Sequence, residues 1–243
     1  MIIATSLDNI PTLPLPIALT IGSFDGVHLG HQHLFQELKK HGTPVVFTFS
    51  NHPSEILRPT DVPAPILTLQ EKLELFEQFG IALTIVVPFT QDLSQIPYDQ
   101  FLKDLREKLP FSTLVGGEDI RIGAHGAGNS KTLSSLGFKT VFLPKFIIYS
   151  EHSETVNLED AKAPRLSDCK SIHISNMDRL TIAQSRELSL SSKSQFQSVR
   201  SIDGQVISSR LIRSLIKNHQ HDQAQKWLGH KKGSLWLDSR AES

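Results

Sequence analysis

Short apolar runs alternate with helical patterns over the first 143 residues of the chain. The runs have the length of buried strands, and the stretches between them repeat apolar residues every three or four positions. In one such stretch, Leu69, Leu73 and Phe76 fall on a single helix face. The predicted strands are 17–21, 44–49, 83–87, 112–116 and 139–143, and the predicted helices between them are 29–41, 69–79, 98–109 and 131–136.

This alternation predicts an α/β fold in which helices cover both faces of a mostly parallel sheet. From residue 145 to about residue 202 the chain is rich in polar residues and has no long period. Such a composition buries little apolar area, so we expect a polar insertion there, partly disordered, with one short helix at 180–188. Helical patterns return at 207–216 and 222–228.

The expected organisation is therefore one domain over residues 1–229, interrupted by the insertion at about 145–202. Gly229 is the predicted C-cap of the last helix, because glycine readily adopts the left-handed conformation that ends helices. A short C-terminal tail, residues 230–243, follows. The length of 243 residues is enough for one such domain with a sizeable core.

Composition argues against a nucleic acid ligand, a disulfide framework and a membrane-spanning segment. The 25 Lys and Arg residues equal the 25 Asp and Glu residues in number, and no long basic run occurs, which argues against a nucleic acid ligand. Cys169 is the only cysteine, so no disulfide framework or cysteine metal site is expected. The N-terminal sequence lacks the features of a signal peptide, and no apolar stretch spans a membrane. We expect a cytoplasmic protein; the sequence predicts no oligomeric state.

The sequence GSFDGVHLGH, residues 22–31, lies directly between the first predicted strand and the first predicted helix. Open α/β sheets bind ligands at this carboxyl end of their strands. Gly22 and Gly26 allow a tight turn and a close approach of the backbone to a ligand. The N-terminus of the following helix presents free N–H groups, which favour a phosphate.

His28 and His31 are three positions apart, so both imidazoles lie on one side of the helix start. They could donate hydrogen bonds to a phosphate as charge builds up during an in-line displacement. Two alternatives remain for this pair. One is a zinc site with Asp25, although no third ligand has an obvious local spacing. The other is a helix cap with incidental histidines.

The same ten residues resemble the His-x-Gly-His signature of the nucleotidyltransferase superfamily. In their wider context they resemble the adenylyltransferase module of bacterial bifunctional riboflavin kinase/FAD synthetases. Further segments are similar to that module and follow in the same order. They are TFSNHP (48–53), TLQEK (68–72), PFT (88–90), GEDIRIG (117–123) and ISSRLIR (207–213).

The resemblance implies a Rossmann-like parallel sheet of strand order 3-2-1-4-5 and an FMN adenylyltransferase activity. In that reaction the FMN phosphate attacks the α-phosphate of ATP in line, which gives FAD and pyrophosphate; Mg²⁺ is expected with ATP, and its protein ligands are not predicted. The site residues it implies are His28, His31 and Arg213 for catalysis, Gly22, Ser23, Phe24, Asp25, Gly30, Ser208 and Ser209 for ATP, and Asn51, His52, Pro53, Asp119 and Arg121 for the flavin.

Physical arguments support parts of this assignment. Ser208 and Ser209 lie where a helix begins, so their hydroxyl and N–H groups suit the β- and γ-phosphates. Arg213 supplies a forked cation for the departing pyrophosphate, and the alternative is a capped surface helix with an ordinary arginine. For Asn51 and His52 the alternative is a plain turn before a proline.

The expected strand order places the first and fourth strands on either side of the ligand crevice. Asp119 and Arg121 follow the fourth strand, so we expect them to line the crevice opposite the two histidines.

The chain departs from the family pattern at three places. Arg210 stands where the family has threonine, and Ile120 and Ile122 replace two phenylalanines. The insertion replaces a short connection. Two alternative functions stay open. One keeps the fold but changes the acceptor to pantetheine phosphate or nicotinamide mononucleotide. The other, suggested by Arg210, is a degenerate flavin- or nucleotide-binding protein without turnover.

In the bifunctional family a six-stranded barrel with kinase activity follows the adenylyltransferase module. The fourteen residues 230–243 are too few to form such a barrel, and the insertion lacks a succession of alternating strands. We therefore expect no riboflavin kinase activity from this chain.

Overall fold

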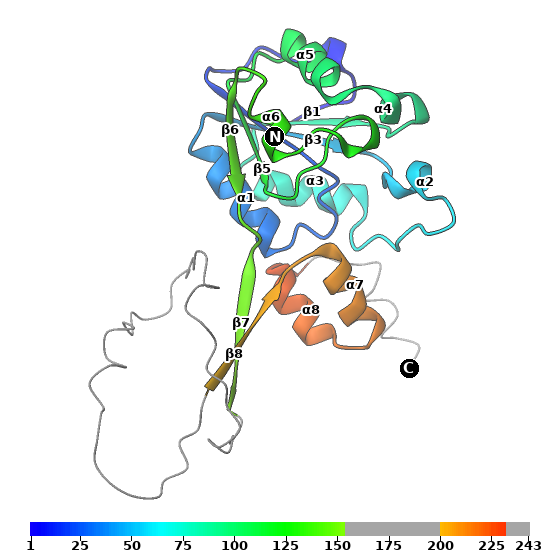
Figure 1. The fold of residues 1–243 in the computed structure, drawn as a ribbon, viewed down its shortest axis with the longest axis vertical. Coiled ribbons are helices and arrows are strands. Elements are labelled where there is room, and N and C mark those ends of the chain that lie inside the picture. The colour runs from blue at the N-terminus through cyan, green and yellow to red at the C-terminus, as the bar shows by residue number, and fades with distance from the viewer. Residues whose placement is uncertain (154–199, 232–243) are drawn as a thin grey trace, which may run out of the picture. The chain divides into compact units, whose positions relative to one another are not determined.

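The computed structural model describes residues 1–153 and 200–231 of the chain. Its core is a six-stranded parallel sheet with helices on both faces (Figure 1). The strands are β1 (Ile2–Ala4), β2 (Ile17–Ile21), β3 (Thr43–Phe49), β4 (Leu83–Val87), β5 (Thr113–Gly117), β6 (Lys139–Leu143), β7 (Ile147–Ser153) and β8 (Arg200–Val206). The helices are α1 (Leu29–Lys39), α2 (Ser54–Leu57), α3 (Leu69–Gln78), α4 (Gln91–Gln95), α5 (Tyr98–Lys108), α6 (Ser130–Leu133), α7 (Ser209–Lys217) and α8 (His221–Leu228), with short 3-10 turns at Leu7–Asn9 and Ala124–Gly126.

The strand order of the large sheet is β1-β4-β3-β2-β5-β6, and all five pairings are parallel. The five predicted strands are β2 to β6, and their order in the sheet is the predicted 3-2-1-4-5. One strand was missed. β1 is only three residues long and pairs with β4 at the edge of the sheet, where Ile2 and Ile3 are half exposed. So short a run gives no readable period.

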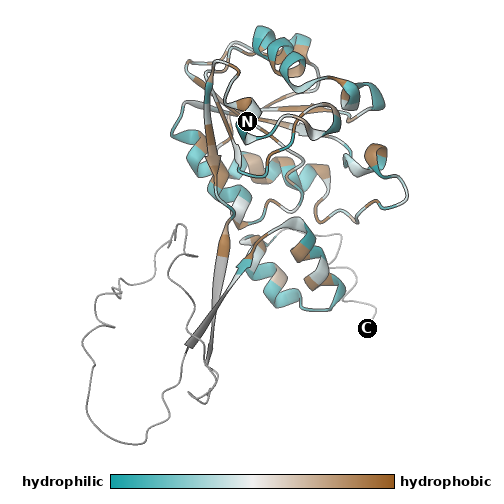
Figure 2. Cartoon of the chain, viewed as in Figure 1, coloured by the Kyte–Doolittle hydropathy of each residue, from teal (hydrophilic) through white to brown (hydrophobic). Residues whose placement is uncertain are grey.

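Side-chain alternation along the central strands builds two hydrophobic cores, one on each face of the sheet. In β2, Ala18 joins the core beneath α1 and α3, whereas Ile17 and Leu19 join the core beneath α5. β3 alternates in the same way, since Val46 belongs to the first core and Phe47 to the second. Figure 2 shows that the helices carry both hydrophilic and hydrophobic residues, as expected of amphipathic helices covering a sheet.

The predicted helices 29–41, 69–79, 98–109, 131–136, 207–216 and 222–228 correspond to α1, α3, α5, α6, α7 and α8. α2 and α4 were not predicted, because helices of four and five residues are too short to show a period. Gly229 adopts the predicted left-handed conformation at the end of α8, with a φ of 71°. None of the described helices combines the length and apolarity that crossing a membrane requires.

Two compact units divide the chain: residues 1–148 with 206–243, and residues 149–205. Strands β7 and β8 pair with each other in a separate two-stranded sheet. These two strands were not predicted; they lie at the two ends of the stretch expected as a polar insertion, 145–202. The apolar sequence FIIY at 146–149 signalled the first strand, but it stood beside a long polar stretch and was assigned to it. The helix predicted at 180–188 lies outside the described residues.

Candidate functional site

The connection between β2 and α1 is a tight loop built from unusual backbone conformations. Phe24, Gly26 and Val27 have φ values of 49°, 82° and 40°, in the left-handed region that non-glycine residues seldom occupy. The side chains of Phe24 and Val27 are buried in the core beneath α1 and α3, and this packing stabilises the strained backbone. At Gly26 a Cβ atom would also come within 3.0 Å of Ile66. The two buried side chains and the glycine therefore stabilise the shape of this loop.

The loop ends at a pair of stacked histidines. His28 is the N-cap residue of α1, and His31 lies in its first turn. Their rings stack with centroids 3.7 Å apart and planes inclined by 17°. The ring of Phe24 meets that of His31 edge-on at 5.2 Å. The spacing of three thus places both imidazoles on one side of the helix, as predicted.

Both histidines are neutral at neutral pH. Burial lowers the pKa of His28 to about 4. Burial, and then the charges of His28 and Lys72, hold the pKa of His31 well below its usual value. Although part of His31 reaches the surface, Nδ1 of both rings is buried and has no hydrogen-bond partner among the described residues. A buried imidazole nitrogen without a partner is unusual in a purely structural residue.

This burial predicts an acid-sensitive fold. Below about pH 6.5 the unfolded chain protonates His28, whereas the folded protein does so only near pH 4. The free energy of unfolding should therefore fall as the pH drops from 6.5 to 4, by about 3 kcal/mol from this residue alone. Urea unfolding at a series of pH values should show a shallower decline in His28→Gln. Equal slopes in the two proteins would contradict a buried, neutral His28.

The two histidines line a cavity of about 570 Å³. Its walls come from the β2–α1 loop, the carboxyl ends of β5 and β6, and the start of α7, which brings together segments almost two hundred residues apart. The predicted site residues that line this cavity are Gly22, Ser23, Phe24, His28, Gly30, His31, Asp119, Arg121, Ser208 and Ser209. Asp25, Asn51, His52, Pro53 and Arg213 are not among its lining residues.

Asp25 instead ties three segments together. Its Oδ1 accepts hydrogen bonds from the backbone N–H groups of Ile66, at 3.0 Å, and Leu67, at 3.4 Å. Its Oδ2 accepts a hydrogen bond from the guanidinium of Arg213, and the Nε of that arginine donates to the carbonyl of Ala64 at 2.8 Å. The Asp25–Arg213 pair therefore fastens the loop to residues 64–67 and to α7.

This geometry does not support the zinc alternative. The carboxylate of Asp25 is directed at two amides and a guanidinium, not at the imidazoles of His28 and His31. Across residues 1–153 and 200–231, no three His, Cys, Asp or Glu side chains are close enough together to hold a metal ion.

The start of α7 meets the cavity through two serines. Ser208 is the N-cap residue, and its Oγ accepts a hydrogen bond from the N–H of Leu211 at 3.3 Å. Ser209 donates its hydroxyl to the carbonyl of Asp25 at 2.6 Å. Both hydroxyls thus stabilise the protein itself, while the first-turn N–H groups point out of the helix end. Arg210 is exposed and is not a lining residue.

The position of Arg210 predicts a nearly neutral substitution. Arg210→Thr restores the residue that the family pattern has, but the side chain lies on the exposed side of α7. We expect kcat and the KM for ATP to change less than about twofold, because surface substitutions rarely shift free energies by more than about 0.5 kcal/mol. Steady-state kinetics of the variant measures this. A large loss of activity would mean that Arg210 contacts the phosphates.

The residues predicted to bind a flavin fall into two groups. Asp119 and Arg121 are exposed and line the cavity together with the two histidines, as the strand order implied. Asn51 exchanges two hydrogen bonds with the backbone of Phe89, Nδ2 to O at 3.1 Å and N to Oδ1 at 2.7 Å. It therefore joins the loops that follow β3 and β4, which favours the plain-turn alternative for this residue.

His52 lies two residues before the short helix α2 and bonds to its first turn. Its Nδ1 accepts a hydrogen bond from the N–H of Ser54 at 3.1 Å, and its own N–H donates to Glu55 at 2.8 Å. Burial lowers the pKa of His52, and the charge of Arg213 lowers it further. Pro53 directly precedes α2. These two residues shape the turn after β3, beside the Asp25–Arg213 pair.

Some functional candidates were missed at the sequence level. Lys145 and Phe146 line the cavity, but they stood at the edge of the stretch assigned to the insertion. Lys72 is buried with three hydrogen bonds at the ends of β2 and β3, and only the family match of TLQEK had drawn attention to it. Gly117 begins the GEDIRIG segment but was not a predicted site residue. A Cβ there would come within 2.9 Å of the carboxylate of Asp119, so glycine allows that carboxylate to lie close to the strand end.

The two isoleucines that replace family phenylalanines differ in position. Ile120 lines the cavity, whereas Ile122 is buried in the core beneath α5. Only the first therefore changes the surface that a ligand would meet.

Comparison with known proteins connects this site to one family. A protein-family model described as FAD synthetase matches residues 11–157, more than half of the chain. A bifunctional riboflavin kinase/FMN adenylyltransferase of Buchnera aphidicola (subsp. Schizaphis graminum) is 30% identical over 142 residues, which are 56% of this chain and 46% of that protein. The protein of the same description from Escherichia coli K12 is 35% identical over 130 residues, 51% of this chain and 42% of that protein.

The chain thus spans about half the length of the curated relatives it matches. Among solved structures, a protein described as a macrolide-efflux protein from Streptococcus pneumoniae is similar, with a TM-score of 0.53 and 23% identity. The match covers 60% of this chain and 51% of that one, and it supports the fold alone.

Proposed function

Because the chain belongs to the FAD synthetase family, we propose that it transfers the adenylyl group of ATP to FMN, giving FAD and pyrophosphate. The observation that carries the proposal is the stacked, neutral pair His28 and His31 in the wall of a cavity that a helix N-terminus also reaches. Such a cavity combines hydrogen-bond donors with a positive helix end, and both suit a polyphosphate.

The reaction needs no protein acid or base. An oxygen of the FMN phosphate, largely deprotonated near neutral pH, attacks the α-phosphorus of ATP. A new P–O bond forms, the bond from the α-phosphorus to the β-bridging oxygen breaks, and pyrophosphate leaves with that electron pair. Catalysis then consists of positioning the two phosphates and stabilising charge in the transition state.

His28 and His31 fit a donor role in this step. Because their pKa values lie far below neutral, the two rings are not protonated to imidazolium and cannot act as acids. Each neutral ring still has one N–H that can donate a hydrogen bond. Hydrogen bonds from these groups to the α-phosphate would strengthen as negative charge grows on its oxygens. Because the two rings stack on each other and Phe24 packs edge-on against His31, they are held in place before the substrate arrives.

The N-terminus of α7 is proposed to bind the β- and γ-phosphates through its first-turn N–H groups. Ser208 and Ser209 shape this end, and the Asp25–Arg213 pair fastens the helix to the loop. Arg213 follows in the same helix and is not a lining residue of the cavity; it is proposed to attract the departing pyrophosphate by its charge, with Asp25 holding the guanidinium in position.

We further propose that Asp119 and Arg121 contact the FMN, and that Asn51, His52 and Pro53 shape the loop beside it. Mg²⁺ is proposed to enter with ATP and offset the charge of its phosphates. Phosphate oxygens and water are the ligands that Mg²⁺ usually keeps beside a nucleotide, so the ion would not need a dedicated cluster of protein ligands.

An acceptor comparison tests the proposed substrate. Purified protein is incubated with ATP and Mg²⁺ and with FMN, pantetheine phosphate or nicotinamide mononucleotide in parallel, and pyrophosphate is measured. We expect pyrophosphate release with FMN and with neither of the other two acceptors. Pyrophosphate release with one of the other acceptors instead would identify that acceptor as the substrate. Tight binding of FAD without release from any acceptor would identify a binding protein without turnover.

A further inference from the structure

Lys72 in α3 is a buried lysine whose ammonium is fully engaged. The residue is 9% exposed. Its Nζ donates hydrogen bonds to the carbonyl of Ser23 at 3.1 Å, the hydroxyl of Thr48 at 3.2 Å and the carbonyl of Phe49 at 3.0 Å. All three acceptors are neutral oxygens, so the ammonium is held by hydrogen bonds rather than by a paired carboxylate.

These three hydrogen bonds connect the chain segments at the place where the parallel strands β2 and β3 stop pairing. The pairing of β2 with β3 ends at Ile21 and Phe47. Beyond it, Lys72 connects the loop residue Ser23 to Phe49 at the end of β3. Ser23 also lines the cavity and directly precedes Phe24, whose ring packs edge-on against that of His31. The lysine is therefore joined to the histidine loop by a hydrogen bond to its backbone.

α3 is positioned for this contact by its own N-terminus. Thr68 and Glu71 form a reciprocal capping box, which fixes the start of the helix four residues before Lys72. Burying an ammonium without a carboxylate partner is costly, and an apolar residue would fill the same space more cheaply. The retained charge therefore calls for a role beyond packing.

The charge also acts on His31. Burial lowers the pKa of Lys72 to about 8, while the carboxylate of Asp25 opposes this shift, so the ammonium is charged at neutral pH. The charged or titratable groups that act on His31 are His28, from the same helix, and Lys72, from α3. Both disfavour protonation of His31, and the nearby Asp25 is already paired with Arg213.

We propose that Lys72 is a positioning residue of the adenylyl-transfer site, which holds the histidine loop at Ser23 and so keeps His31 in place. This inference rests on the proposed function for its catalytic consequence. Its structural part, the link between Lys72 and the titration of His31, is independent of any substrate.

The test compares Lys72→Met, which removes the charge at similar length, with Lys72→Arg, which keeps it. The titration of His31 is followed by NMR of histidine-labelled protein without substrates, with His31→Gln to assign the signal. In Lys72→Met the midpoint of His31 should move upward, and kcat should fall by up to roughly 10²-fold because the loop shifts. In Lys72→Arg the midpoint should stay close to that of the unchanged protein.

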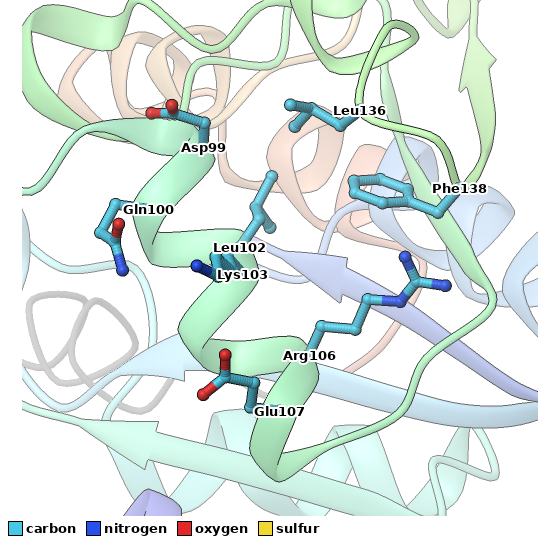
Figure 3. A pocket seen from close by; sticks show the side chains of 8 residues that line it. All are labelled: Asp99, Gln100, Leu102, Lys103, Arg106, Glu107, Leu136 and Phe138. Carbon is cyan, nitrogen blue, oxygen red and sulfur yellow. The ribbon is translucent and has the colours of Figure 1, made fainter.

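Lys103→Met is the matched control, because Lys103 is an exposed lysine of α5 (Figure 3). It should leave both the titration and kcat unchanged. If Lys72→Met does not fold, the Lys72→Arg and Thr48→Val variants decide. Thr48→Val removes the hydroxyl that accepts a hydrogen bond from Lys72 but keeps the charge of the lysine. An altered titration midpoint of His31 in both variants would overturn the proposal.

An unchanged His31 midpoint in folded Lys72→Met would also overturn it, whether or not the enzyme uses FMN. An absence of FMN turnover in every protein, combined with the expected NMR shift, would instead reject the proposed function and leave the link between Lys72 and His31 intact.

Discussion

Replacing either His28 or His31 with alanine is expected to lower kcat by roughly 10²–10³, in line with the loss of a hydrogen-bond donor from a transition state. The KM for ATP should change little, because the donors act mainly on charge that appears during the reaction. The stacked geometry adds a further expectation. Removing one ring leaves the other without its 3.7 Å neighbour, so the double variant should lose less than the sum of the two single losses.

Single-turnover and steady-state kinetics with FMN and ATP measure these effects. His219→Asn is the control: His219 is exposed at the end of α7 with a φ of 57°, a conformation that asparagine tolerates. Near-normal turnover of either alanine variant would contradict the donor role. Activity abolished by a chelator and restored by zinc but not by magnesium would favour the metal alternative.

The second large effect is expected at Asp25. In Asp25→Ala the amides of Ile66 and Leu67 and the guanidinium of Arg213 all lose their acceptor. Breaking a buried pair costs 3–5 kcal/mol; here the side chains are 10% and 21% exposed, so we expect the free energy of unfolding to fall by about 2–4 kcal/mol. Turnover should fall as well, since the loop and α7 are no longer fastened together.

Arg213→Ala should destabilise the protein less, because the carboxylate of Asp25 keeps two amide partners. It should still weaken productive use of ATP, by the roughly 1.5–3 kcal/mol of a charge-assisted hydrogen bond. Urea unfolding of both single variants and the double variant gives the coupling between the two residues. Additive losses, or an Asp25→Ala protein as stable as the original, would show that the pair does not organise the site.

The sequence was most informative about long alternating patterns, which predict strands and helices, and about short motifs, whose residue spacing predicts neighbouring side chains. Five strands followed from apolar runs alternating with helical periods, their order was implied by the family resemblance, and the placement of His28 beside His31 followed from a spacing of three. β1 escaped prediction because three residues at a sheet edge, two of them half exposed, show no period. The strand at 147–153 escaped because its apolar start adjoins a long polar stretch.

The partners of individual side chains were harder to predict. Asp25 and Arg213 are 188 positions apart, and nothing in either motif shows that each is the other's partner. Asn51 belongs to a motif that the resemblance assigns to flavin binding, yet its amide is used on the backbone of Phe89. Lys72 lies on the buried side of α3. A hydrophobic pattern treats lysine as a polar residue and therefore predicts that it faces solvent. Such contacts depend on the three-dimensional fold rather than on local sequence.

The most direct test of the account measures both products of one reaction. Purified protein, ATP, Mg²⁺ and FMN are mixed, and FAD and pyrophosphate are quantified over time. The proposed function predicts that the two appear in equal amounts, at a rate proportional to protein concentration, and that His28→Ala abolishes most of both. If the folded protein yields neither FAD nor pyrophosphate while the same assay detects both with a known FMN adenylyltransferase, the central claim is wrong.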